Sequence, residues 1–162
     1  MKKVLYLALI IFSAFSFTAC VEDDDEWRDK NEKFYEKLAE DPEYSIVSLP
    51  GVADAVYYKV LEKGEGTEYP LQTSQVKVLY RGFYYTGTEF DSGHQDINYP
   101  ATLNVNGVVR GLSIALQNMK VGDKWEVWVP WPLGYGSTSY NSISAYTTLG
   151  FEVEILEIIM YP

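Results

Sequence analysis

Apolar and polar residues alternate along much of the chain, as expected of β-strands that bury one face. Between residues 124 and 129 the core-facing positions are Trp125, Val127 and Val129, and the opposite face carries Lys124, Glu126 and Trp128. The same period of two recurs from Leu149 to Ile155. Including shorter apolar runs punctuated by glycine, the pattern predicts strands over 56–61, 75–85, 100–105, 124–129 and 149–156.

The segment 78–90 predicts a β-hairpin. Val78 and Tyr80 are expected on one face of its first strand, and Thr86-Gly87 supplies the tight turn, because glycine adopts positive φ without steric cost. The returning strand is expected to end at Asp91. This hairpin would place Tyr80, Phe90 and Asp91 close together.

Two segments have helical spacing. Trp27, Phe34, Tyr35 and Leu38 recur at helical intervals within 27–40, and Asp41-Pro42 is expected to end that helix. This helix could pack on the domain, mediate dimerisation or serve as a stalk. A shorter helix is predicted by Leu112, Ala115, Leu116 and Met119, which share one face. Several antiparallel strands with one short central helix on one face make an α+β fold.

The N-terminus has the plan of a secretory signal, because Met1-Lys2-Lys3 is basic and residues 4–17 are almost all apolar. Phe17-Thr18-Ala19-Cys20 resembles a bacterial lipobox, which implies removal of residues 1–19 and lipidation of Cys20. The alternative is an ordinary signal peptide followed by a free thiol. Cys20 is the only cysteine, so no intrachain disulfide can form.

An acidic run, Glu22-Asp23-Asp24-Asp25-Glu26, follows Cys20. Five adjacent carboxylates repel one another, which predicts a solvated, flexible spacer. The run also resembles the surface-export tag of some Gram-negative lipoproteins, and its ligand spacing argues against a calcium site. We therefore divide the chain into a lipoprotein signal peptide (1–19), an acidic tether and helix (20–50) and a folded domain (51–162).

Charge and composition exclude several functions. A net charge of −10 without a basic cluster disfavours nucleic-acid binding. His94 is the only histidine, and its spacing from Asp91 and Asp96 matches no standard metal site, so it is interpreted as a solvated loop residue. The serines of segment 137–144 have no neighbouring base. The long loop 130–146 is the expected place for function, since long loops in compact domains are usually functional.

Several motifs, in order and in register from about 56 to 158, resemble the FKBP-type peptidyl-prolyl isomerases. They are Val56–Leu61, Tyr80-Arg81-Gly82 with Thr86-Gly87 and Phe90-Asp91-Ser92, Asn106–Gly111, Met119–Asp123, Pro130–Gly136 and Thr148–Leu156. The resemblance implies a curved antiparallel sheet wrapped on the short helix, and rotation of X-Pro bonds in proline-containing polypeptides. That reaction needs no cofactor or metal.

The resemblance also implies a set of site residues. Tyr80, Phe90 and Phe151 would form aromatic walls, Val109 would offer its backbone N–H, and Tyr135 would offer its hydroxyl. Asp91 would hydrogen-bond to Tyr80 or Arg110; its alternative role is a turn cap near Gly93. The remaining substrate-binding positions would be Leu103, Val108, Leu112 and Ile143.

The sequence departs from the family pattern inside this site. Leu112 stands where the family usually has Trp, Leu103 where Phe is common, and Tyr140 and Tyr146 occupy a loop that usually contains prolines. Both leucines reduce the aromatic surface.

We therefore expect an isomerase that assists folding of exported proteins at the cell envelope, anchored to the outer membrane through Cys20. The alternatives are a catalytically weak FKBP-like module that binds peptides or acts as a chaperone, and a surface lipoprotein that uses the fold for adhesion or nutrient capture.

Overall fold

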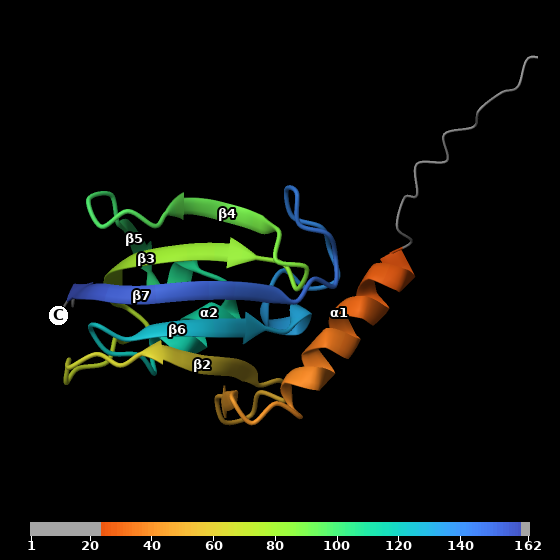
Figure 1. Cartoon of the computed structure of the whole chain (residues 1–162), viewed down its shortest axis with the longest axis horizontal. Coiled ribbons are helices and arrows are strands. Elements are labelled where there is room, and N and C mark those ends of the chain that lie inside the picture. The colour runs from red at the N-terminus through yellow and green to blue at the C-terminus, as the bar shows by residue number, and fades with distance from the viewer. Residues whose placement is uncertain (1–23, 160–162) are drawn as a thin grey trace, which may run out of the picture.

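A computed structural model describes residues 24–159 of the 162-residue chain. In this part of the chain, seven strands form one antiparallel sheet, with two α-helices and two short 3-10 helices (Figure 1). In chain order the elements are α1 (Asp24–Leu38), β1 (Ser45–Val47), β2 (Val56–Glu62), β3 (Gln75–Phe83), β4 (Glu89–His94), β5 (Ala101–Asn104), η1 (Val105–Gly107), α2 (Arg110–Leu116), β6 (Lys124–Val129), η2 (Trp131–Leu133) and β7 (Leu149–Ile159).

The sheet has the order β1-β2-β6-β7-β3-β4, and β5 also pairs with β3. β3 therefore has β7 along one edge and shares its other edge between two strands. β5 pairs with the first part of β3, where Val78 lies opposite Ala101. β4 pairs with the second part, where Gly82 lies opposite Asp91. β4 and β5 therefore lie one after the other along the same edge of β3.

The main core lies between the sheet and α2, as the alternation predicted. Val78, Val127 and Val153 are fully buried on the inner face of the sheet, and every residue of α2 after Arg110 is buried. Gly111 allows the close approach, because a Cβ atom there would lie 2.4 Å from Val129 Cγ1. Each buried aliphatic side chain contributes about 1.5–3 kcal/mol relative to an exposed one, so this layer is the main source of stability. The predicted α+β architecture is confirmed.

A second apolar cluster joins α1 to the opposite face of the sheet. Trp128 was predicted on the polar face of its strand, yet it is only 5% exposed. Phe34 of α1 packs against it with a ring-centroid distance of 4.5 Å, and Leu38 and Phe83 belong to the same buried cluster. In Figure 1, α1 lies across the end of the sheet. Of the three roles left open for this helix, the structure supports packing on the domain.

Several element boundaries differ from expectation. α1 begins at Asp24, so three of the five acidic residues lie in its first turn, where carboxylates favour the helix dipole. β1 lies in the segment assigned to the tether, where no strand was predicted, and it pairs with β2. β4 continues past Asp91 to His94 because register shifts in its pairing with β3 accommodate the irregularity. The last strand runs three residues further than predicted, to Ile159.

The predicted signal peptide and Cys20 lie outside the described residues. Among residues 24–159, the helices are too short or too polar to cross a lipid bilayer.

Candidate functional site

A cavity of about 410 Å³ opens on the inner face of the sheet, beside α2 and below the loop that follows η2. It is lined by Tyr80, Phe90, Asp91, Leu103, Gly107, Val108, Val109, Leu112, Tyr135, Tyr140 and Phe151. All the predicted catalytic and substrate-binding residues except Ile143 are therefore brought to one cavity. They come from β3, β4, β5, β7, α2 and two loops.

Tyr80 and Asp91 are joined by a hydrogen bond at the wall of this cavity. The Tyr80 hydroxyl donates to Asp91 Oδ2 at 2.6 Å, so of the two predicted partners of Asp91 the structure has Tyr80. Burial is the main cause that raises the pKa of Tyr80, and the bond to Asp91 adds to it. The phenol therefore stays protonated at neutral pH and remains a donor to the carboxylate.

Phe90 and Phe151 make the aromatic part of the wall. Their rings meet edge to face with centroids 5.9 Å apart, a favourable geometry for aromatic pairs. Phe90 lies directly over Gly82 of β3, where a Cβ atom would be 2.4 Å from Phe90 Cε2. Only glycine at position 82 lets the Phe90 ring approach the backbone of β3 this closely, which explains the glycine that follows Tyr80 and Arg81.

Tyr135 and Tyr140 form a stacked pair at the mouth of the cavity. Their ring centroids are 4.6 Å apart with an interplanar angle of 6°, and their exposed fractions are 37% and 53%. Burial first, and then the neighbouring Tyr140 and Asp91, raises the pKa of Tyr135. Its hydroxyl is therefore a donor at neutral pH.

Ile143 was predicted to bind substrate but is not among the residues that line the cavity. Its side chain is 6% exposed and packs in the main core, while its backbone exchanges two hydrogen bonds of 2.9 Å with Tyr140. Asn141, with φ of 51°, reverses the chain between them. The tight turn buries Ile143 and turns Tyr140 to the cavity. In the sequence, an aromatic residue followed by Asn, which favours turns, was the signal that could have placed Tyr140 in the site.

Aliphatic side chains form the floor. Leu112 is 3% exposed and occupies the position where the resemblance implies Trp, and Leu103 and Val108 lie beside it in the lining. Val109 immediately precedes α2, and the first amides of a helix have no acceptor within the helix. A backbone donor at this point can be directed to a bound carbonyl.

His94 has a closer relation to the site than the sequence indicated. It ends β4, is partly buried, and stacks on Tyr80 with ring centroids 5.6 Å apart. Its Nδ1 lies 3.3 Å from the Tyr99 carbonyl oxygen. Across the described residues, no three His, Cys, Asp or Glu side chains come together as a metal site.

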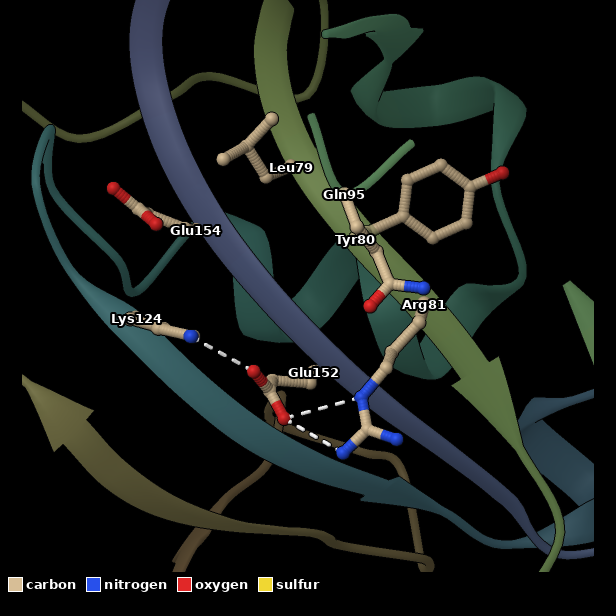
Figure 2. A pocket seen from close by; sticks show the side chains of 7 residues that line it. All are labelled: Leu79, Tyr80, Arg81, Gln95, Lys124, Glu152 and Glu154. Atoms are coloured by element: carbon tan, nitrogen blue, oxygen red, sulfur yellow. Dashed lines mark hydrogen bonds and ion pairs between the residues drawn. The ribbon is translucent and has the colours of Figure 1, made fainter. Parts of the chain in front are cut away.

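A smaller hollow of about 110 Å³ lies on the outer face of the same strands (Figure 2). Glu152 is paired there with Arg81 at 2.9 Å and with Lys124 at 2.8 Å, so the ion pairs link β3, β7 and β6. Burial alone would raise the pKa of Glu152, but the hydrogen bonds from Lys124 and Arg81 outweigh it and lower that pKa. Charged side chains make up most of this hollow, with Leu79 and Tyr80 as its apolar and aromatic members, whereas the cavity on the inner face is lined mainly by aromatic and aliphatic residues.

Comparison with known proteins gives one consistent family. Residues 66–156 match the family described as FKBP-type peptidyl-prolyl cis-trans isomerase. The "FKBP-type 22 kDa peptidyl-prolyl cis-trans isomerase" of Escherichia coli is 44% identical over 103 residues, which cover 63% of this chain. The "Outer membrane protein MIP" of Legionella longbeachae is 37% identical over 114 residues, covering 70% of this chain.

Among solved structures, FkpA from Escherichia coli superposes with a TM-score of 0.75 at 29% sequence identity, covering 86% of this chain and 62% of that one. The chain spans about half the length of the curated relatives it matches, 49% and 47% of the two proteins above.

Proposed function

Because the chain belongs to the FKBP-type peptidyl-prolyl cis-trans isomerase family, we propose that it catalyses rotation about X-Pro bonds in exported polypeptides. The observation that carries this proposal is the cavity of about 410 Å³, whose aromatic and aliphatic lining includes the hydrogen-bonded pair Tyr80 and Asp91. A prolyl ring is apolar and compact, and such a cavity is chemically matched to it.

The chemistry requires no nucleophile, proton transfer or metal. The barrier of about 18–20 kcal/mol arises from amide resonance, which is lost when the C–N bond twists. An enzyme accelerates this step by binding the twisted amide more tightly than the planar one. A thousandfold acceleration needs only about 4 kcal/mol of differential binding.

Each predicted site residue that lines the cavity has a role in this proposal. Phe90, Phe151 and Leu112 surround the prolyl ring and exclude water from it. This apolar environment favours the twisted amide, which is less polar than the planar one. The Val109 backbone N–H and the Tyr135 hydroxyl hold carbonyl groups of the bound peptide. Asp91 orients Tyr80 and makes one edge of the cavity polar. Leu103 and Val108 complete the floor.

The test is a protease-coupled assay with a proline-containing peptide. Acceleration above the spontaneous rate at micromolar protein is expected, and its absence would remove the enzymatic claim. Phe90→Ala should reduce kcat/KM at least about tenfold, because the variant lacks one aromatic wall. Tyr69→Ala is the matched control, since Tyr69 is 48% exposed and is not among the residues that line the cavity. Equal activity of the two variants would place the reaction elsewhere.

A second candidate function, a weakly catalytic module that binds peptides or acts as a chaperone, is favoured by Leu112 and Leu103. Both line the cavity at positions where the resemblance implies aromatic rings. A leucine buries the prolyl ring but cannot stack on it. Measurable peptide binding with a spontaneous isomerisation rate would support this candidate over the enzyme.

We also propose that the protein is held at the cell envelope through acylated Cys20. The lipobox-like sequence before Cys20 and the name of the Legionella relative, an outer membrane protein, support this localisation. Cys20→Ser should move the protein from the membrane fraction to the soluble fraction of the producing cells. Continued membrane association of that variant would contradict anchoring at Cys20.

A further inference from the structure

The helix α1 is bonded to the loop that carries Tyr135 and Tyr140. We call residues 134–148 the substrate loop; it lies beside α1 in Figure 1. Trp27 Nε1 donates to Thr147 Oγ1 at 2.9 Å, and Thr147 Oγ1 in turn donates to the Ser144 carbonyl oxygen at 2.7 Å. The helix thus bonds to a hydroxyl that itself closes a turn of the loop.

Asn31 fixes the end of the same loop. Its side chain is fully buried, its Oδ1 accepts the Thr148 backbone N–H at 2.8 Å, and its Nδ2 donates to the Trp27 carbonyl oxygen at 2.9 Å. A buried amide is costly unless both ends are bonded, and here both are. The Arg28 guanidinium lies 4.7 Å from the centroid of the Tyr146 ring, which adds a cation–π contact to the loop.

A second set of contacts runs from α1 to the cavity wall. The rings of Trp27 and Tyr84 meet edge to face with their centroids 5.9 Å apart. The centroids of the Tyr84 and Phe90 rings are 5.1 Å apart. The Tyr84 hydroxyl also donates to the Ser142 carbonyl oxygen at 3.3 Å. Trp27 therefore reaches both the wall at Phe90 and the middle of the substrate loop through one intermediate side chain.

None of the α1 residues lines the cavity. The helix can therefore affect a bound peptide only through the elements it holds. An isolated helix of this length is marginal in water, so its order depends on these same contacts. A helix that served only as a tether would not need a buried, doubly bonded Asn directed at the substrate loop.

We propose that Trp27 and Asn31 are positioning residues for the isomerase site, and that α1 sets its affinity for peptides. They hold the substrate loop so that the stacked Tyr135 and Tyr140 stay at the cavity mouth, and they support Phe90 through Tyr84. This inference rests on the proposed function, because the affinity in question is that of the cavity for proline-containing peptides.

Two variants test the proposal in the full chain. Trp27→Phe removes the indole donor, and Thr147→Val removes the hydroxyl that accepts it. Each should raise KM for a proline-containing peptide by about three- to tenfold, with kcat changed less than about twofold. Thr147→Ser keeps the hydroxyl and should restore KM.

A second readout does not require activity. Hydrogen exchange at the Ile143 and Tyr146 amides reports the loop directly, because these N–H groups donate within it, to Tyr140 and Gly136 oxygens at 2.9 Å. Trp27→Phe and Thr147→Val should speed their exchange about tenfold.

The matched control is Tyr35→Phe. The Tyr35 hydroxyl donates to the Ala55 carbonyl oxygen at 2.6 Å, a bond between the same helix and the domain but outside the substrate loop. This variant should lower Tm while KM and loop exchange stay unchanged.

The proposal is overturned if Trp27→Phe and Thr147→Val, like the control, lower Tm but leave KM and loop exchange at wild-type values. An inactive wild-type protein would instead refute the proposed function. In that case the exchange measurement alone decides whether α1 holds the loop, and unchanged exchange would still overturn the inference.

Discussion

The Tyr80 hydroxyl and Asp91 Oδ2 lie 2.6 Å apart although their residues are not register partners. Tyr80 lies opposite His94, and Asp91 lies opposite Gly82, with a register shift between these pairs. The irregular pairing of β3 and β4 therefore brings both side chains to the same cavity. Tyr80 and Asp91 are thus diagonal neighbours across the pair, a separation that an aromatic side chain can span.

Tyr80→Phe and Asp91→Asn should act on activity as a unit. Tyr80→Phe removes the donor of this hydrogen bond, and Asp91→Asn removes the negative charge of its acceptor, so each should lower kcat/KM by about tenfold. The double variant should lose well under the hundredfold that independent effects would give. Protease-coupled kinetics on the four proteins would check this, and simple additivity would show that the pair is not a functional unit.

Gly82→Ala should lower activity although Gly82 itself is not among the residues that line the cavity. The added methyl group would overlap the Phe90 ring, whose Cε2 and Cζ lie 2.4 and 2.6 Å from the Cβ position, so the ring must move. We expect kcat/KM to fall about tenfold, with a cost in stability of about 1–3 kcal/mol from the displaced ring. Gly87→Ala is a contrasting variant. Gly87 has φ of 85°, and a Cβ atom there would have no neighbour within 4 Å. This substitution strains the backbone without displacing a side chain of the site, so it should lower Tm and leave kcat/KM unchanged.

The strands of the domain were predictable because their inner faces alternate strictly. Val76 and Val78, with Tyr80 next on the same face, show the period of two that the sheet then uses. The short helix was predictable for the same reason, since its apolar spacing matches the face buried on the sheet. The cavity residues were found through the family motifs, because composition and spacing alone leave aromatic walls and core packing indistinguishable.

The features that the sequence did not predict depend on contacts between residues in different elements. Trp128 looked like an outward position, and it is buried because a helix distant in sequence covers it. Ile143 was expected to bind substrate, but the turn at Asn141 places it in the core and leaves Tyr140, which was given no site role, in the lining of the cavity. β1 has only three residues, too few for a periodic pattern to be recognised.

Leu112→Trp should strengthen peptide binding. Leu112 lies in the lining of the cavity at 3% exposure, where the resemblance implies an indole, and a cavity of about 410 Å³ leaves space for a larger ring. Because an aromatic ring can stack on proline, we expect a Kd lower by about three- to tenfold. Isothermal titration with a proline-containing peptide would measure it. Weaker binding together with a lower Tm would mean that the floor is already filled and Trp overpacks it.

The tyrosines joined to the domain by hydrogen bonds should make stability fall at alkaline pH. Burial is the main cause that raises the pKa of Tyr44 to about 12, and its hydrogen bond to Glu126 contributes; burial likewise raises the pKa of Tyr35 and Tyr80. The unfolded chain releases these protons near pH 10 while the folded chain retains them. The unfolded state then binds fewer protons, so the free energy of unfolding decreases as pH rises above about 10.

Below about pH 9 these tyrosines are protonated in both states, so their contribution to stability is complete and constant. Calorimetry should therefore give a Tm that these groups leave unchanged between pH 7 and 9 and that falls by about 5 °C or more between pH 9 and 11.5. Tyr44→Phe removes one of the responsible protons and should make the alkaline decrease shallower, even if its Tm at pH 7 is lower. An alkaline decrease as steep in that variant as in the wild type would show that Tyr44 does not retain its proton as its burial and its bond to Glu126 imply.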